Sequence, residues 1–262
     1  ANVPARGDWR GIVFLAGSTG NVLNHTVVSY GGGGGVWPAN IYTETSALTI
    51  SASVISESAN TGIWANGGNP WPASCCSNPA GNTGANLTPT ISGNVIENNS
   101  GTGIYLHVSN AAVVNNTIRG NLYGIYLSSS SNPTFTGNSL SGNTQGNGIH
   151  VNGGPLVGSG TWQAGTPYIL NGDLTIPAGV TLTLAPGTVV KIEGAGNDFM
   201  VEGTLNANGT TALPIVFTSF KDDAYGGDTN GNGNVSVPAR GDWGGIVFLA
   251  GSVGNILNHT VV

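Results

Sequence analysis

Acidic and amide side chains in one glycine-rich segment are the residues best suited to metal binding. Residues 221–234 read KDDAYGGDTNGNGN, with oxygen-bearing side chains at alternate positions of a tight loop. Such a loop provides the ligands that Ca²⁺ requires. The predicted ligands are Asp222, Asp223, Asp228, Asn230, Asn232 and the carbonyl of Asn234. Ala239 stands where a calcium loop has its bidentate Glu. The pattern therefore leaves two interpretations open, a calcium site and a flexible Gly-Asn loop.

A second set of residues could bind sugars. Five rings each follow a recurring Ile, or a residue at the equivalent position, by one place, and they are Tyr42, Trp64, Tyr105, Tyr126 and His150. In a strand, that position points to the opposite face from the Ile. We expect an exterior aromatic ladder. Its plain role is stacking between strands, which stabilises by about 0.5–1.5 kcal/mol per pair; the alternative is a strip that grips glycans or a neighbouring fibre.

The remaining candidates for catalysis are few. Cleavage of a glycosidic bond needs paired carboxyl groups, and the whole chain has 12 Asp and Glu residues. Asp8 and Asp242 occupy the same position of a repeated sequence, and so do His25 and His259. An active site copied in this way would be unusual, and histidines in Asn-His-Thr are more often solvated or bonded within a turn. We predict that the chain is not an enzyme.

Two periods organise these residues. Residues 3–28 and 237–262 differ at three of 26 positions, which gives a period of 234 residues. We interpret the chain as one full unit and the start of the next, within a longer tandem array in one polypeptide. Repeat architectures of this kind bury their apolar faces by stacking neighbouring units.

The shorter period is about 22 residues, with the consensus I-x-x-N-x-I-x-x-N-x-x-G-I-x-L. Short alternating apolar segments between Gly, Asn and Ser predict strands. The aligned columns are Ile50, Ile91, Val113 and Phe135; Ile55, Ile96, Ile118 and Leu140; and Asn94, Asn116 and Asn138. Glu97 and Arg119 follow equivalent columns, so we expect them to form a pair on adjacent turns.

One larger step in the short period contains an insertion. We expect a loop over about residues 66–88, which includes the adjacent Cys75 and Cys76. Two adjacent cysteines cannot form a disulfide framework. A vicinal disulfide and free or intermolecularly paired thiols both remain open.

Composition limits the partners. Charged residues make up 7% of the chain, with six Lys and Arg and a net charge of −6. So few cations give no surface that could neutralise phosphates, which argues against nucleic acid. No apolar run approaches the roughly 18 residues of a membrane span. We expect neither nucleic-acid binding nor membrane insertion.

The Asn-rich turns resemble the right-handed parallel β-helix of the pectate-lyase-like superfamily. The segment from TIPAGVTLTLAPGTVVKI through PIVFTSFKDDAYGGDTNGNGN to GDWGGI is similar to repeat modules of large bacterial surface and secreted proteins. The resemblance implies an all-β, single-stranded right-handed parallel β-helix (solenoid) with about 22 residues per turn, which we expect to run through residues 1–262 as one body.

This resemblance is specific for fold and weak for activity. The arginine-bearing strands and His-Gly segments that β-helix enzymes place beside their acids have no counterpart here. We predict a structural repeat of an extracellular bacterial filament or cell-surface stalk. Its expected partners are copies of itself along the fibre axis, either as covalent tandem repeats or as subunits stacked head to tail, with glycans as a further option. A carbohydrate-binding adhesin module and a polysaccharide-cleaving β-helix remain the alternatives.

Overall fold

The computed structural model describes residues 3–35, 37–68 and 86–262. It is all-β apart from one short 3-10 helix, η1 (Gly233–Val235). The chain forms two compact units, Ala1–Tyr126 with Ser131–Thr144 (unit 1) and Leu127–Ser130 with Gln145–Val262 (unit 2). No helix among the described residues is long and apolar enough to cross a membrane. That residues 1–262 form one continuous β-helix stays a prediction.

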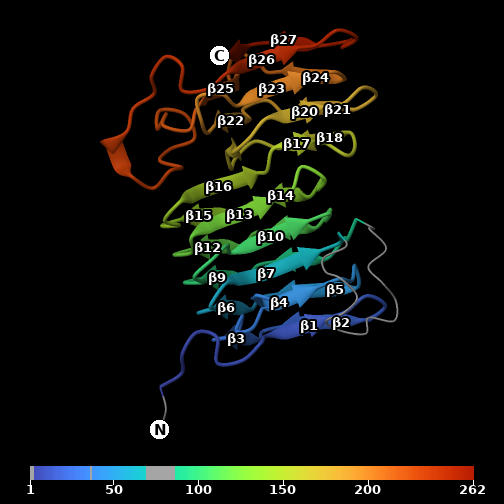
Figure 1. Cartoon of the computed structure of the whole chain (residues 1–262), viewed down its shortest axis with the longest axis vertical. Coiled ribbons are helices and arrows are strands. Elements are labelled where there is room, and N and C mark those ends of the chain that lie inside the picture. The colour runs from blue at the N-terminus through green and yellow to red at the C-terminus, as the bar shows by residue number, and fades with distance from the viewer. Residues whose placement is uncertain (1–2, 36, 69–85) are drawn as a thin grey trace. The chain divides into compact units, whose positions relative to one another are not determined.

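Unit 1 stacks turns of three strands each, and each strand pairs with its counterpart one turn away (Figure 1). Sheet A contains β1 (Ile12–Phe14), β4 (Ala39–Thr43), β7 (Thr61–Asn66), β10 (Ile104–His107) and β13 (Tyr123–Leu127). Sheet B contains β2 (Asn21–Asn24), β5 (Leu48–Ser51), β8 (Thr90–Ser92), β11 (Ala112–Val114) and β14 (Thr134–Thr136). Sheet C contains β3 (Val27–Ser29), β6 (Val54–Ser56), β9 (Val95–Glu97), β12 (Thr117–Arg119) and β15 (Ser139–Ser141).

Unit 2 has the same plan. Sheet D contains β16 (Gly146–Val151), β19 (Tyr168–Leu170), β22 (Val189–Ile192), β25 (Ile215–Ser219) and β28 (Thr260–Val261). Sheet E contains β17 (Gly154–Pro155), β20 (Leu174–Ile176), β23 (Asp198–Val201) and β26 (Gly245–Phe248). Sheet F contains β18 (Gly160–Trp162), β21 (Thr181–Leu184), β24 (Thr204–Asn208) and β27 (Ile256–Asn258).

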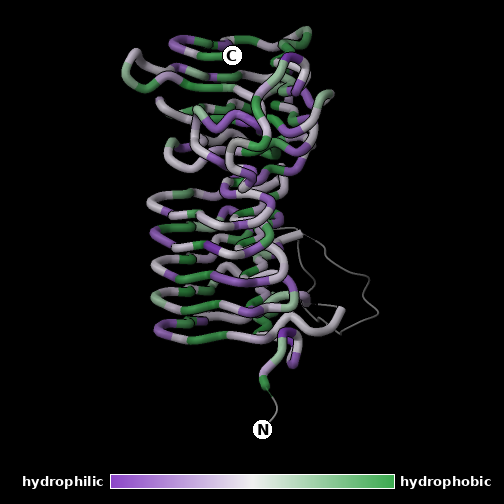
Figure 2. Tube along the Cα trace, turned by 90° about the vertical axis from the view of Figure 1, so that its left-hand side faces the viewer, coloured by the Kyte–Doolittle hydropathy of each residue, from purple (hydrophilic) through white to green (hydrophobic). Residues whose placement is uncertain are grey.

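This is the predicted right-handed parallel β-helix, in the predicted register. Ile91 pairs with Ile50 on one side and Val113 on the other, and the second apolar column pairs in the same way. These residues are buried, with exposed fractions of 0% for Ile50, Ile91 and Val113. Figure 2 shows the apolar segments recurring from turn to turn. Stacking is what gives such short strands a core, because one turn alone leaves its inner face open.

The predicted pair of Glu97 and Arg119 is confirmed. The two residues are register partners in β9 and β12, and Arg119 Nε lies 2.7 Å from Glu97 Oε2. Arg119 is 55% exposed, so the pair contributes at most about 1 kcal/mol. Its significance is that it fixes the turn length at 22 residues here.

The predicted inserted loop falls between β7, which ends at Asn66, and β8, which begins at Thr90. Most of it, including Cys75 and Cys76, lies outside the described residues.

Candidate functional site

Two chains of asparagine side chains run along the corners of unit 1. The first contains Asn94, Asn116 and Asn138, and the second contains Asn99, Asn121 and Asn143. In both chains the Oδ1 of one Asn accepts hydrogen bonds from the backbone N–H and the Nδ2 of the Asn one turn earlier, at 2.9–3.0 Å. Each link therefore joins neighbouring turns twice.

The amides also hold backbone carbonyls. Asn116 Nδ2 donates to the Ile91 carbonyl, and Asn121 Nδ2 donates to the Ile96 carbonyl. Asn94, Asn116 and Asn121 are each 1% exposed. A buried amide must find partners within the protein, and here the corner geometry provides them on every turn. The sequence analysis aligned the first of these chains as a column. The second chain occupies the other Asn position of the 22-residue consensus.

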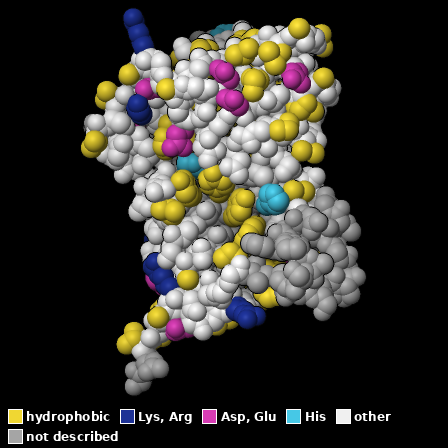
Figure 3. Space-filling view, viewed as in Figure 1, with side chains coloured by type: hydrophobic (Ala, Val, Ile, Leu, Met, Phe, Trp, Pro, Cys, Tyr) yellow, Lys and Arg dark blue, Asp and Glu magenta, His cyan; other side chains and the backbone are white. Residues whose placement is uncertain are grey.

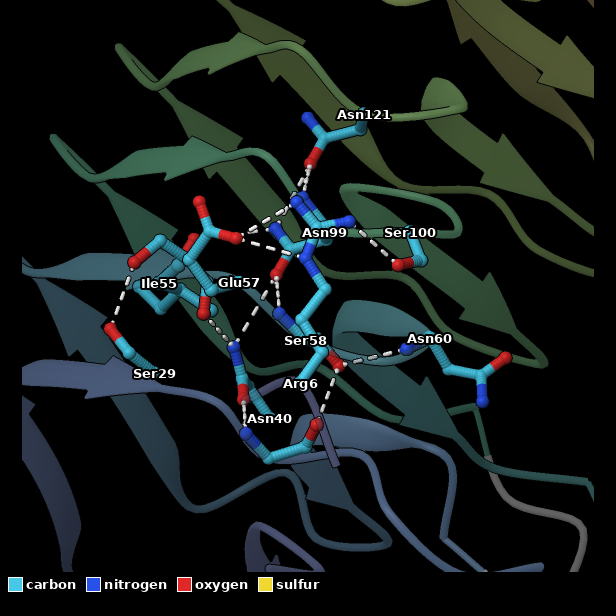
Figure 4. A network of polar contacts seen from close by, with 12 residues as sticks. Arg6, Ser29, Asn40, Ile55, Glu57, Ser58, Asn60, Asn99, Ser100 and Asn121 are labelled. Carbon is cyan, nitrogen blue, oxygen red and sulfur yellow. Dashed lines mark hydrogen bonds and ion pairs between the residues drawn. The ribbon is translucent and has the colours of Figure 1, made fainter. Parts of the chain in front are cut away.

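The second chain ends in a polar network at the first turns (Figure 4). Ser58 N–H donates to Asn99 Oδ1, and Asn40 Nδ2 donates to the Ser56 carbonyl at 2.7 Å. On the surface beside it, Arg6 bonds Glu57 and Ser100. Ser58 and Asn40 therefore provide the hydrogen-bond partners of Asn99 at the end of the second chain, where the regular column of asparagines ends.

The aromatic column lies on the outer face of sheet A, as the register places Tyr42, Trp64 and Tyr105 side by side. Ring centroids are 5.4 Å apart for Tyr42 and Trp64, 5.3 Å for Trp64 and Tyr105, and 5.8 Å for Tyr105 and Tyr126. Trp64, Tyr105 and Tyr126 are partly exposed, whereas Tyr42 is 0% exposed. An exposed ladder over all five residues is therefore wrong at Tyr42.

A line of polar contacts runs beside these rings. Tyr42 donates its hydroxyl proton to Glu44 Oε1 at 3.0 Å and accepts from Asn66 Nδ2 at 3.0 Å. Asn66 Oδ1 lies 2.8 Å from Nδ1 of His107. Partial burial lowers the pKa of His107, which favours the neutral imidazole. This contact line links three strands of sheet A and was not predicted from the sequence.

His150 belongs to unit 2 and is 1% exposed, so it is also wrong as an exposed ladder member. Its ring packs edge-on against Phe220, with centroids 6.0 Å apart, and an added Cβ on Gly146 would meet it. Burial lowers the pKa of His150 to about 4, because the charged imidazolium loses its hydration.

This burial predicts a pH dependence of stability. Between pH about 6.5 and about 4, unfolded His150 takes up a proton that folded His150 resists, so stability falls as pH falls, by at most about 3 kcal/mol. His150→Leu should flatten that slope in urea unfolding measured from pH 7 to 4.5. His107 leaves a smaller slope of the same sign in both proteins. Parallel curves for the two proteins would contradict the burial argument.

The predicted calcium ligands lie in the segment that follows β25, next to a lysine that the sequence analysis did not single out. Lys191, from β22, is 0% exposed, and its Nζ donates to the Asp222 carbonyl, the Gly227 carbonyl and Thr229 Oγ1 at 2.7–2.9 Å. Burial lowers the pKa of Lys191 to about 8, although Asp223, Asp222 and Asp228 raise it. The cation that the structure places in this loop is therefore an ammonium group.

The acids of the loop organise its turns. Asp228 accepts from the backbone N–H groups of Asn232 and Gly233 at 3.1 and 2.8 Å. Asp222 accepts from the Thr218 hydroxyl and the Ala224 N–H. The other predicted ligands are placed as follows: Asp223 has a buried Oδ1 without a hydrogen-bond partner in the described structure, Asn230 and Asn232 donate to Ser236, and Asn234 lies in η1.

Within the described residues, no three His, Cys, Asp or Glu side chains form a group that could hold a metal ion. Calcium stays a prediction that this geometry does not strengthen.

The remaining candidate residues lie in the two copies of the repeated sequence, residues 3–28 and 237–262. Asp8 accepts from the Ala5 N–H at 2.8 Å, and Asp242 accepts from the Ala239 N–H at 2.8 Å. His25 and His259 stand at positive φ, 52° and 47°, at equivalent turns. Asp242 is further held by Lys221, which lowers the pKa of its carboxyl to about 2. Both acids therefore close turns.

The comparison with family models agrees with this architecture. Residues 10–156 match the model of a right-handed beta helix region, and residues 154–260 match that of a pectate-lyase-like beta helix domain. No curated protein and no solved structure matches the chain. The first match covers more than half of the 262 residues. The chain therefore belongs to the right-handed β-helix family.

Proposed function

We propose that this chain is a structural repeat of an extracellular bacterial filament or cell-surface stalk, which has copies of itself along its axis as partner. The observation that carries the proposal is the pair of buried asparagine ladders. They use buried asparagine side chains to join each turn to the next. A stalk needs cohesion along its axis, and hydrogen bonds in a dry environment supply it.

The surface fits the same role. Charged side chains are few and scattered on the face that Figure 3 shows. Sparse charge gives little long-range steering of ligands. An extracellular or surface location follows from the similarity to modules of secreted and surface proteins and is part of the proposal.

The second candidate is a carbohydrate-binding module, which a specific observation favours. The rings of Trp64, Tyr105 and Tyr126 form a partly exposed row with spacings of 5.3 and 5.8 Å. Aromatic faces of this kind can hold apolar faces of sugar rings. The fold also carries enzymes, so polysaccharide cleavage is the third possibility.

Single-molecule extension of the chain between two handles tests the structural role. Because each turn contacts mainly its neighbours, we expect unfolding in steps that release about 22 residues, or about 75 Å of extended chain. Asn116→Leu should lower the force of the steps in unit 1 and leave the others unchanged. Collapse of the whole chain in one low-force event would contradict the proposal.

A glycan array and assays of reducing-sugar release from uronic polymers separate the alternatives. The structural role predicts neither binding nor release. Saturable binding that Trp64→Ala abolishes would establish the carbohydrate module instead, and sugar release would establish the enzyme.

A further inference from the structure

One row of side chains on the outer face of sheet D is buried. The register places His150, Ile169 and Lys191 in that row, on β16, β19 and β22. They alternate with core residues such as Val151 and Leu170, so their side chains point away from the core. Their exposed fractions are nevertheless 1%, 0% and 0%. Another part of unit 2 therefore covers this row.

The cover is the segment of residues 220–229, which leaves β25 and runs back along sheet D (Figure 1). At its start, the Phe220 ring packs edge-on against His150, with centroids 6.0 Å apart. At its end, the Thr229 carbonyl accepts a hydrogen bond from the Asn147 N–H at 2.7 Å. We call this segment the strap.

The strap joins strands that are not neighbours. In a solenoid, each turn otherwise contacts only the turns next to it. The asparagine ladders of unit 1 follow that rule, since each link joins one turn to the next. In sheet D, by contrast, β16 lies three strands before β25, with β19 and β22 between them. By reaching back to β16, the strap ties four turns together.

The ammonium group of Lys191 fastens the middle of the strap. An ammonium group has three N–H donors and no acceptor. Lys191 donates to the Asp222 carbonyl, the Gly227 carbonyl and Thr229 Oγ1 at 2.7–2.9 Å, and all three acceptors belong to the strap. The Asp223 carboxylate adds negative charge nearby. Because a buried charge is tolerated only when it is paired and hydrogen-bonded, the lysine and the strap stabilise each other.

We propose that residues 220–229 are a strap that closes over the outer face of sheet D and ties β16 to β25, with the Lys191 ammonium group as its fastener. The strap opens as one element while the sheets beneath it stay folded, as local opening units of proteins do. When closed, it keeps ligands from this face; when open, it uncovers His150 and Ile169. The inference goes beyond the proposed function and does not depend on it.

Amide hydrogen exchange measured by NMR tests the strap in Lys191→Met, with a chelator present throughout. Methionine keeps an unbranched side chain but has no N–H to donate. The Asn147 N–H, which is bonded to the strap, should exchange at least about tenfold faster than in the unchanged chain. The Ile149 N–H lies on the same strand but donates to the Pro167 carbonyl, so it should keep its rate.

Lys221→Met is the matched control. Lys221 also lies in the strap, but its side chain is 49% exposed and pairs with Asp242, so its replacement should leave both exchange rates unchanged. Lys221 also gives a second readout, because trypsin can cleave after it only when the strap opens. In Lys191→Met, that cleavage should be at least about tenfold faster than in the unchanged chain.

Thr229→Val is a milder second variant, which keeps the shape of the side chain and removes one of the three acceptors. It should speed exchange of the Asn147 N–H by a smaller factor, about threefold. Unchanged Asn147 exchange in both Lys191→Met and Thr229→Val would overturn the role of the lysine. Equal acceleration at Asn147 and Ile149 would show that the sheet opens together with the segment, and it would overturn the strap as a separate element.

Discussion

Asn116→Leu should destabilise unit 1 by about 3–5 kcal/mol. Leucine has the branched shape of asparagine in a somewhat larger side chain, but it cannot replace the two bonds that Asn116 Oδ1 accepts from Asn94 or the two that its Nδ2 donates. The Ile91 carbonyl and the Asn94 N–H would stay buried without these partners. Each unsatisfied buried group costs about 1–3 kcal/mol. Urea unfolding followed by circular dichroism measures the loss.

Asn60→Ala is the matched control. Asn60 has an exposed side chain, and its hydrogen bonds come from its backbone. Its replacement should change stability by less than about 0.5 kcal/mol. Equal effects at the two positions would mean that the ladder adds nothing beyond ordinary surface polarity.

Gly103→Ala should cost about 2–3 kcal/mol, although alanine is normally the better residue outside special conformations. Gly103 belongs to the recurring Gly-Ile pair and has no positive φ. A Cβ there would lie 2.7 Å from the Gly124 carbonyl oxygen and 2.6 Å from Ile118 Cγ2. The glycine is required by close approach of the next turn, since backbone cannot move aside cheaply. Thermal unfolding should show a Tm lower by several degrees.

Gly158→Ala is the control for this substitution. An added Cβ at Gly158 meets nothing within 4 Å, and its φ is not positive. We expect no loss, or a small gain from the reduced freedom of the unfolded chain. A Gly103→Ala protein as stable as this control would show that adjacent turns are less tightly packed than the structure has them.

The sequence predicted the regular part of the molecule because that part is periodic. A column such as Ile50, Ile91 and Val113 repeats its side-chain type at the spacing of one turn, so register can be read without coordinates. Asn94 and Asn116 were aligned for the same reason. The pairing of Glu97 with Arg119 followed from the columns beside it.

The sequence did not predict which side chains cover the outer faces of the sheets. Alternation assigned Tyr42 and His150 outward, yet Tyr42 is buried within contacts to Glu44 and Asn66, and His150 lies against Phe220. These contacts come from side chains that do not share the short period. The buried Lys191 was also not predicted. The sequence feature that could have indicated it is a lysine within an apolar strand, about 30 residues before an acidic loop.

The most direct test of a structural repeat that is cohesive along its axis is single-molecule extension of the unchanged chain beside Asn116→Leu. If the asparagine ladders join the turns, the unchanged chain unfolds in steps of about 22 residues, and the variant loses force only in the steps of unit 1. Equal forces for the two proteins, or collapse of the unchanged chain in one low-force event, would contradict the structural role.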